Sequence, residues 1–196
     1  LAESKGGVSS LAALAMTKGT KNYTALEFAQ ILEDRGIKII PSSGSDVFSV
    51  SVLTTKGELD KTLELLDEVV NNAAFDQTEI DKIKSEQLNQ IKRNNDIPIQ
   101  RAIDEYRDLI FKNSPYSLSS KVLEKNIPSI SREDIINYYN KIFTPQNVVI
   151  SVNGSVDRDK VSAKLNEIFN KRCGQKFDYI SNNGRISKPT SPRTTV

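Results

Sequence analysis

Residues 37–70, IKIIPSSGSDVFSVSVLTTKGELDKTLELLDEVV, decide the fold class of this chain. Phe48, Val50 and Val52 alternate with two serines, which is the pattern of a strand with one buried face. Residues 37–40 predict a second short strand that Pro41 should break. The spacing then becomes helical, with apolar side chains at Leu59, Leu63, Leu66 and Val70 on a helix that starts near Glu58. A strand pair followed by an amphipathic helix predicts a sheet covered by helices.

Helices are expected along most of the remaining sequence. Thr24 and Glu27 form a capping box that opens a helix, and Gly36 should end it. Ser131 and Asp134 give a second capping signature. Further helices are expected over 8–16, 77–95, from 98 onward, over about 120–125, and over 157–170.

A third alternating stretch, with Val148, Ile150 and Val152 separated by Val149 and Ser151, predicts another strand. Long helices alternating with two or three such strands indicate an α+β fold, an antiparallel sheet covered on one face by helices. Residues 1–172 are expected to form this domain. Residues 173–196 are rich in Ser, Asn, Gly, Pro and Lys, which is typical of a linker.

The composition excludes several kinds of site. The chain has 196 residues, no histidine and one cysteine, Cys173. Ser-His-Asp and Cys-His catalysis, zinc sites built on histidine and a disulfide within the chain are therefore excluded. The formal net charge is +2, which gives no global electrostatic case for nucleic acid as a partner. No apolar run reaches the roughly 18–20 residues of a transmembrane segment.

The order of short segments carries a family resemblance. A helix ending in Lys18-Gly19-Thr20 precedes the capped helix, and Ser43-Gly44-Ser45-Asp46 leads into a strand. Near the other end, Phe143-Thr144-Pro145-Gln146-Asn147 precedes the last predicted strand. In this order the chain resembles the M16 (insulinase, or pitrilysin-like) metallopeptidase family, which includes the mitochondrial processing peptidase. The resemblance covers nearly the whole chain and implies the M16 peptidase domain fold.

The family's catalytic motif is not present at the positions where the resemblance places it. That motif is His-x-x-Glu-His on the helix before Lys-Gly-Thr, with a further glutamate ligand on a later helix. The two histidines fall on Ser10 and Leu14, the catalytic glutamate on Ala13, and the distal glutamate on Gln90. Alanine and leucine have no donor atom, and serine and glutamine are poor zinc ligands. The resemblance therefore implies a domain with no catalytic residue, no metal ligand and no cofactor of its own.

The resemblance also implies partners. M16 enzymes have two similar halves that close around a peptide, and only one half carries zinc. The chain is expected to be a non-catalytic domain of such an assembly, with the zinc-bearing half in the same polypeptide or in another. The linker would lead to a second M16-like domain, and strands that belong before Leu1 are expected to be missing here. The sequence does not distinguish between the bacterial periplasm, the cytoplasm and an organelle matrix as the compartment of this chain.

The sequence leaves alternatives for the function of the chain and for one of its loops. The chain could be a structural scaffold subunit without a peptidase role, as in the respiratory cytochrome bc complex. It could also be a separate module that binds extended peptides by strand addition. Ser114-Pro115-Tyr116, where the family often has His-Pro-Tyr, either lines the peptide chamber or fixes a loop through a buried tyrosine.

Overall fold

The computed structural model describes residues 5–111 and 116–172, and residues 37–70 form the predicted strand pair and helix. Strands β1 (Lys38–Ser43) and β2 (Phe48–Leu53) are antiparallel, in a register that pairs Ser43 with Phe48. Pro41 does not break β1, contrary to expectation, but pairs with Val50 inside the strand. A proline is tolerated there because β1 has a strand neighbour on one edge only among the described residues.

The described residues form eight α-helices and two strands, together with three short 3-10 helices. The eight α-helices have the bounds α1 Val8–Ala15, α2 Ala25–Asp34, α3 Leu59–Asn71, α4 Gln77–Asn95, α5 Pro98–Ile110, α6 Ser120–Asn126, α7 Arg132–Ile142 and α8 Arg158–Asn170. Both predicted capping boxes are present, at Thr24 before α2 and at Ser131 before α7. Gly36 follows α2 with a φ of +62°, a left-handed conformation that suits glycine.

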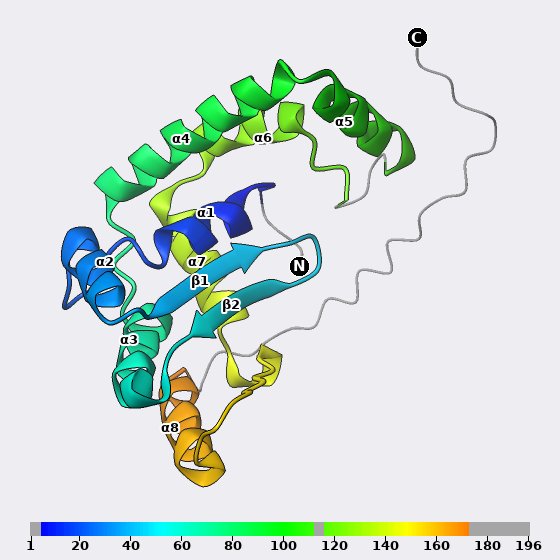
Figure 1. Cartoon of the computed structure of the whole chain (residues 1–196). Helices are drawn as coiled ribbons and strands as arrows, with labels where there is room; N and C mark the ends of the chain where they lie inside the picture. Colours follow the sequence, from blue (N-terminus) through cyan, green and yellow to red (C-terminus); the bar gives the residue numbers. More distant parts are fainter. Residues whose placement is uncertain (1–4, 112–115, 173–196) are drawn as a thin grey trace.

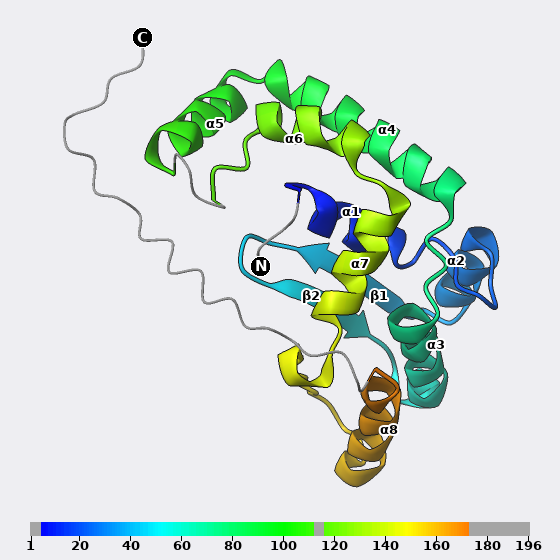
Figure 2. The same cartoon turned by 180° about the vertical axis from the view of Figure 1, so that it is seen from behind.

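The helices cover one face of the strand pair, which confirms the predicted α+β arrangement. Seen from behind, α7 lies across both strands, and α1 lies beside β1 (Figures 1 and 2). Phe48 of β2 packs against Tyr138 and Phe143 at ring-centroid distances of 6.3 and 5.5 Å. On the other face Ile40, Ser49 and Ser51 are exposed. One side of the sheet is therefore core and the other is surface.

The hydrophobic core joins residues far apart in the sequence. It contains the buried sides of α1, α3, α7 and α8 together with Phe28 of α2. Arg172, after α8, donates hydrogen bonds to the carbonyl oxygens of Phe143 (2.7 Å) and Val70 (2.9 Å) and stacks over the Tyr139 ring. These contacts fix the C-terminal helix against the rest of the core.

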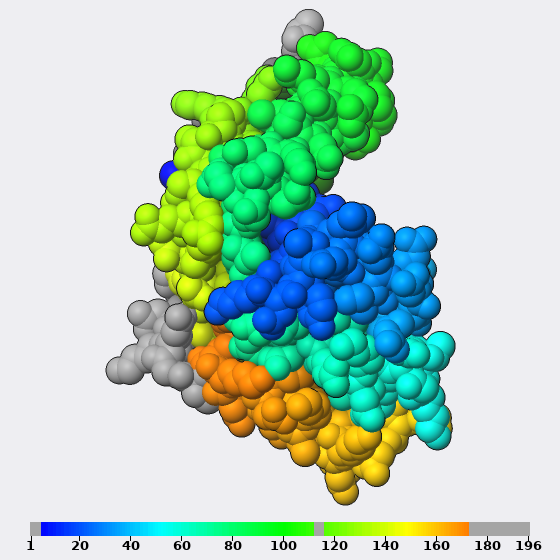
Figure 3. All heavy atoms as spheres, turned by 90° about the vertical axis from the view of Figure 1, so that its left-hand side faces the viewer, coloured from blue at the N-terminus to red at the C-terminus, as the bar shows by residue number. Residues whose placement is uncertain are grey.

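Helix α4 contributes Ile80 and Ile83 to this core, and α5 lies beyond its C-terminal end. In Figure 3 the green atoms of α4 and α5 rise above the blue atoms of the N-terminal residues. No residue of α5 is buried, although its apolar side chains share one stripe. No helix in the described part of the chain is long and apolar enough to cross a membrane.

The prediction of a strand at Val148–Val152 is wrong for the described chain. These residues follow a short 3-10 turn, Pro145–Asn147, and have no strand assignment. Val149 is 97% exposed and Val152 50% exposed. The alternation of side chains is present, but no described strand lies beside the segment to accept its hydrogen bonds. A strand requires such a neighbour as well as the pattern.

Candidate functional site

The candidate site lies where α1 faces α4. Helix α1 is short and rich in alanine, and Val8, Leu11, Ala12 and Ala15 bury its inner side against α7 and β1. Its opposite side carries Ser10 and Leu14, which are four residues apart and so share one helix face. Gln87 of α4 donates a hydrogen bond from Nε2 to Ser10 Oγ at 2.6 Å. The structure therefore brings the first predicted motif position against α4.

The next two motif positions differ in exposure. Ala13 is 3% exposed, and Leu14 is 43% exposed. Neither side chain can donate or accept a hydrogen bond, and neither can transfer a proton. The neighbouring Ser9 instead contacts the sheet, because Ser43 Oγ donates to Ser9 Oγ at 2.6 Å. The polar contacts of α1 thus tie it to β1 and α4 and leave no acid or base on the face.

Gln90, the predicted distal position, has its polar atoms occupied within α4. Its Nε2 donates to Asn94 Oδ1 at 2.8 Å, and its Oε1 accepts from Arg93 at 2.6 Å. Gln90 is exposed, whereas Gln87 is half-buried against α1. The sequence analysis did not identify Gln87. A signal was available, since Gln87 continues the apolar stripe of α4 formed by Ile80, Ile83 and Ile91.

Tyr116 lies beside the tip of the β1–β2 hairpin. Its hydroxyl donates to Asp46 Oδ1 at 2.5 Å, and its ring packs against Phe111. That hydrogen bond to a carboxylate raises the pKa of Tyr116 above its ordinary value. Tyr116 is 39% exposed, so the alternative of a buried tyrosine is wrong. Ser114 and Pro115 lie outside the described residues, as do Cys173 and the predicted linker 173–196.

The sequence matches two family models that together span most of the chain. The model described as "Insulinase (Peptidase family M16)" matches residues 2–120. The model described as "Peptidase M16 inactive domain" matches residues 129–195. The chain belongs to the M16 peptidase family. The resemblance inferred from the order of short segments is thereby confirmed.

Individual M16 proteins agree with this assignment. The chain is 24% identical to an "uncharacterized zinc protease" of Rickettsia felis over 91% of its own length and 45% of that protein's. It is 23% identical to the "non-peptidase homolog YmxG" of Helicobacter pylori over 84% of the chain and 38% of that protein. The crystal structure of a peptidase M16 inactive domain from Pseudomonas fluorescens superposes with a TM-score of 0.78 at 23% identity, over 85% of this chain and 41% of that one. The chain thus spans less than half of the length of each of these three relatives.

The zinc of the M16 family does not fit the residues present here. Zinc in proteins is bound by cysteine, histidine or carboxylate groups. The α1 face and Gln90 offer one hydroxyl and one amide, and the hydroxyl already accepts from Gln87. Within the described residues, no three His, Cys, Asp or Glu side chains are grouped so that they could hold a metal. No step of metal-dependent hydrolysis can be assigned to the residues of this face.

Proposed function

We propose that this chain is a non-catalytic domain of an M16-type peptidase assembly and helps a zinc-bearing half to enclose and bind peptide. One observation carries the proposal. In a chain of this family, the helix that precedes Lys18-Gly19-Thr20 carries Ser10, Ala13 and Leu14, none of which is a cysteine, histidine or carboxylate that could bind zinc or activate water. Such a domain can still form part of the surface that encloses the peptide, and it can contact the substrate.

The uncovered face of the sheet supplies a candidate for that wall. Ile40 on β1 is 49% exposed and Leu53 on β2 is 56% exposed, on the side that no helix covers (Figure 1). Exposed apolar side chains on a rigid strand pair suit contact with an extended peptide or with a partner half. Because the chain spans less than half of its relatives, the catalytic half could lie in the same polypeptide or in a separate subunit.

The test combines metal analysis with reconstitution. The purified chain should contain no stoichiometric zinc and should hydrolyse no unfolded peptide alone. Added to a zinc-bearing M16 half from the same genome, it should raise peptide hydrolysis at least tenfold. The control is the same half with the glutamate of its own His-x-x-Glu-His motif replaced by glutamine, which should stay inactive. One tightly bound zinc per chain, or hydrolysis by the chain alone, would contradict the proposal.

Surface variants separate wall contact from folding. Ile40→Asp should remove most of the stimulation because it places a charge on the uncovered sheet face. Leu26→Asp is the matched control, since Leu26 is 68% exposed on α2, away from that face. If the wild-type chain co-purifies with the catalytic half but does not stimulate peptide hydrolysis, the scaffold role is favoured instead.

A further inference from the structure

Helix α5 has an apolar stripe that no part of the described chain covers. Ile99, Ile103, Tyr106 and Ile110 follow one another at intervals of four, three and four residues, so their side chains share one face of the helix. All four are exposed, and Ile99 at 63% and Tyr106 at 61% are the most open. No residue of α5 belongs to the hydrophobic core cluster or packs against it. A contiguous apolar patch of this kind is typical of an interaction surface.

The side of α5 that faces the rest of the protein is its polar side. Asp104 Oδ2 accepts a hydrogen bond from the backbone N–H of Ser120 at 3.2 Å, and Glu105 Oε1 accepts one from Lys121 Nζ at 2.5 Å. Both donors belong to the first turn of α6, which lies beside α5 in Figures 1 and 2. Asp104 and Asp108 are half-buried, whereas the apolar stripe is exposed. A surface helix normally turns its apolar side inward, so α5 has the reverse orientation.

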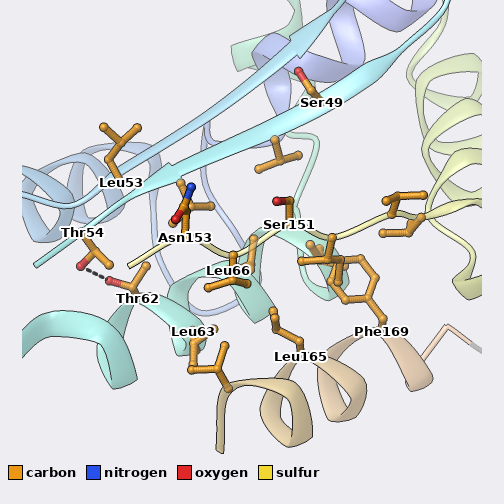
Figure 4. A pocket seen from close by; sticks show the side chains of 18 of the residues that line it. Ser49, Leu53, Thr54, Thr62, Leu63, Leu66, Ser151, Asn153, Leu165 and Phe169 are labelled. Carbon is orange, nitrogen blue, oxygen red and sulfur yellow. Dashed lines mark hydrogen bonds between the residues drawn. The ribbon is translucent and has the colours of Figure 1, made fainter. Parts of the chain in front are cut away.

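An apolar pocket beside β2 is a different kind of feature. Leu63 and Leu66 of α3 and Leu165 of α8 are among the residues that line it (Figure 4). All three belong to the hydrophobic core cluster. Helices α5 and α8 lie at opposite ends of the molecule in Figures 1 and 2. The stripe on α5 is therefore a separate surface and not an extension of the core.

The exposed charges around the stripe are mostly positive. Between residues 92 and 107, two exposed side chains are carboxylates and four are cations, the latter being Lys92, Arg93, Arg101 and Arg107. One of the two carboxylates, Glu105, is already paired with Lys121. Arg101 and Arg107 form no hydrogen bond or ion pair with any other described residue. Arg107 lies one helical turn from both Ile103 and Ile110, at the edge of the stripe. The surface is complementary to apolar side chains bordered by carboxylates.

The form of this surface favours a helix of another protein as its occupant. Helix α5 has 13 residues, and its length is therefore about 20 Å. A single apolar stripe on a helix packs against the stripe of a second helix, with the side chains of one between those of the other. Tyr106 and Arg107 are of the residue types that contribute most to binding at protein interfaces.

Two other occupants fit the charges less well. A lipid surface is disfavoured because α5 carries more carboxylates than cations, whereas helices that lie on membranes are rich in Lys and Arg. A second copy of the chain is disfavoured because a two-fold axis brings the same surface to both sides of the contact. The stripe of the second copy would then present another Arg107 where a carboxylate is required.

We propose that the apolar stripe of α5 binds an amphipathic helix of a partner protein whose apolar face is bordered by carboxylates. Tyr106 packs at the centre of this contact, and Arg107 pairs with one of the partner's carboxylates. The proposal goes beyond the proposed function, because it concerns α5 and not the uncovered face of the sheet, and because it requires no zinc-bearing half.

The experiment measures the binding of two synthetic helical peptides to the whole chain by isothermal titration calorimetry. Both peptides have about four helical turns with leucines along one face. The leucines are bordered by glutamates in one peptide and by lysines in the other. The glutamate peptide should bind at least tenfold more tightly, and NMR shift changes on binding should map to α5 and not to the pocket beside β2. Equal affinities, tighter binding of the lysine peptide, or shifts confined to the pocket would overturn the proposal.

Surface variants separate the apolar contact from the charged one. Tyr106→Asp should weaken binding of the glutamate peptide at least tenfold, and Arg107→Glu should remove the preference for glutamate over lysine. Leu26→Asp, at an exposed position of α2, is the matched control and should change neither result. Binding that is unaffected by Tyr106→Asp, or a preference that survives Arg107→Glu, would overturn the proposal.

The same variants test the other occupants. Sedimentation of the chain over a range of concentrations detects a second copy, and co-sedimentation with vesicles of phosphatidylglycerol and phosphatidylcholine detects a lipid surface. The chain should stay monomeric and should not bind the vesicles through α5. Dimerisation or vesicle binding that Tyr106→Asp abolishes would assign the stripe to that occupant and overturn the proposal.

Discussion

Replacing Asp134 with asparagine should lower the free energy of unfolding by about 1 kcal/mol at neutral pH. Asp134 Oδ2 accepts from Lys5 Nζ at 2.8 Å and from the Ser131 backbone N–H at 2.8 Å. It thereby closes the capping box of α7 and ties the residues before α1 to that helix. Asparagine keeps an oxygen of the same shape but removes the charge.

The size of the effect follows from the pKa of Asp134. The hydrogen bond from Lys5, and then that from Ser131, lower this pKa from 3.8 to about 2. A lowering of that size corresponds to an upper limit of about 2 kcal/mol. The side chains of Lys5 and Asp134 are 39% and 23% exposed, so solvent screening reduces the expected value to about 1 kcal/mol. For a domain of this size, that is a fall in Tm of about 2–4 °C.

The sign of the pH dependence is fixed by the direction of the shift. The folded state holds the carboxylate ionised, so its stabilisation is complete above the ordinary pKa of 3.8 and is lost as the pH falls through about 2. The difference between the wild type and Asp134→Asn should therefore be constant at neutral pH and shrink in acid. Urea unfolding at several pH values, followed by circular dichroism, measures it.

Two further variants serve as controls. Asp60→Asn removes the Lys160–Asp60 pair, whose side chains are 63% and 69% exposed, and should cost less than about 0.5 kcal/mol. In a Lys5→Met background, Asp134→Asn should lose part of its cost, because the two side chains interact directly. A cost that does not change with pH, or that is the same in both backgrounds, would refute the assignment.

Four further changes test other parts of the structure. Phe28→Ala should destabilise by about 3–5 kcal/mol, because Phe28 is fully buried, whereas the exposed Leu26→Ala should cost under about 0.5 kcal/mol in the same denaturant assay. Arg172→Met should cost about 2–3 kcal/mol, since it leaves the Phe143 and Val70 carbonyls without their charged donor; Arg172→Lys should recover only part of this. Gly19→Ala should lower Tm because Gly19 has a φ of +99° and a Cβ there would lie 3.2 Å from the Ala25 nitrogen, whereas Gly57→Ala, with open space around it, should not. With Ser10→His and Leu14→His in place, Gln87→Glu should bind zinc at least tenfold more tightly than Gln90→Glu by competition with a chelator, because Gln87 is the residue that reaches Ser10; equal affinities would contradict this geometry.

The helix boundaries could be predicted because their causes are local. The side chains of Thr24 and Ser131 each accept a hydrogen bond from a backbone N–H three residues later. The carboxylate of that later residue accepts a hydrogen bond from the backbone N–H of Thr24 or Ser131. Each capping box therefore lies within four consecutive residues. Asp76 and Asp157 cap α4 and α8 by a simpler local contact, in which each side chain accepts hydrogen bonds from backbone N–H groups two and three residues later. Such contacts need no knowledge of what packs on the helix.

Features that depend on a neighbouring segment cannot be predicted from local sequence alone. Pro41 was expected to end a strand, but an edge strand without a second neighbour accepts it. Counting along the chain pointed to Gln90, whereas the rotation of α4 about its axis turns Gln87 towards Ser10. Residue counting cannot resolve one helical turn when the intervening loops differ in length. Whether Gln90 corresponds to the family's distal glutamate stays a prediction, as does the division into residues 1–172 and a linker.

The sequence by itself determined the family, the helix starts and the absence of zinc-binding side chains at Ser10, Ala13 and Leu14. Residue identity is sufficient for these, because a missing donor atom cannot be supplied by folding. Only the tertiary structure decided which side of α4 meets α1 and where the sheet is open. Val148–Val152 has the pattern of a strand, yet it is not one in the described chain, since pairing is a property of two segments and the pattern belongs to one.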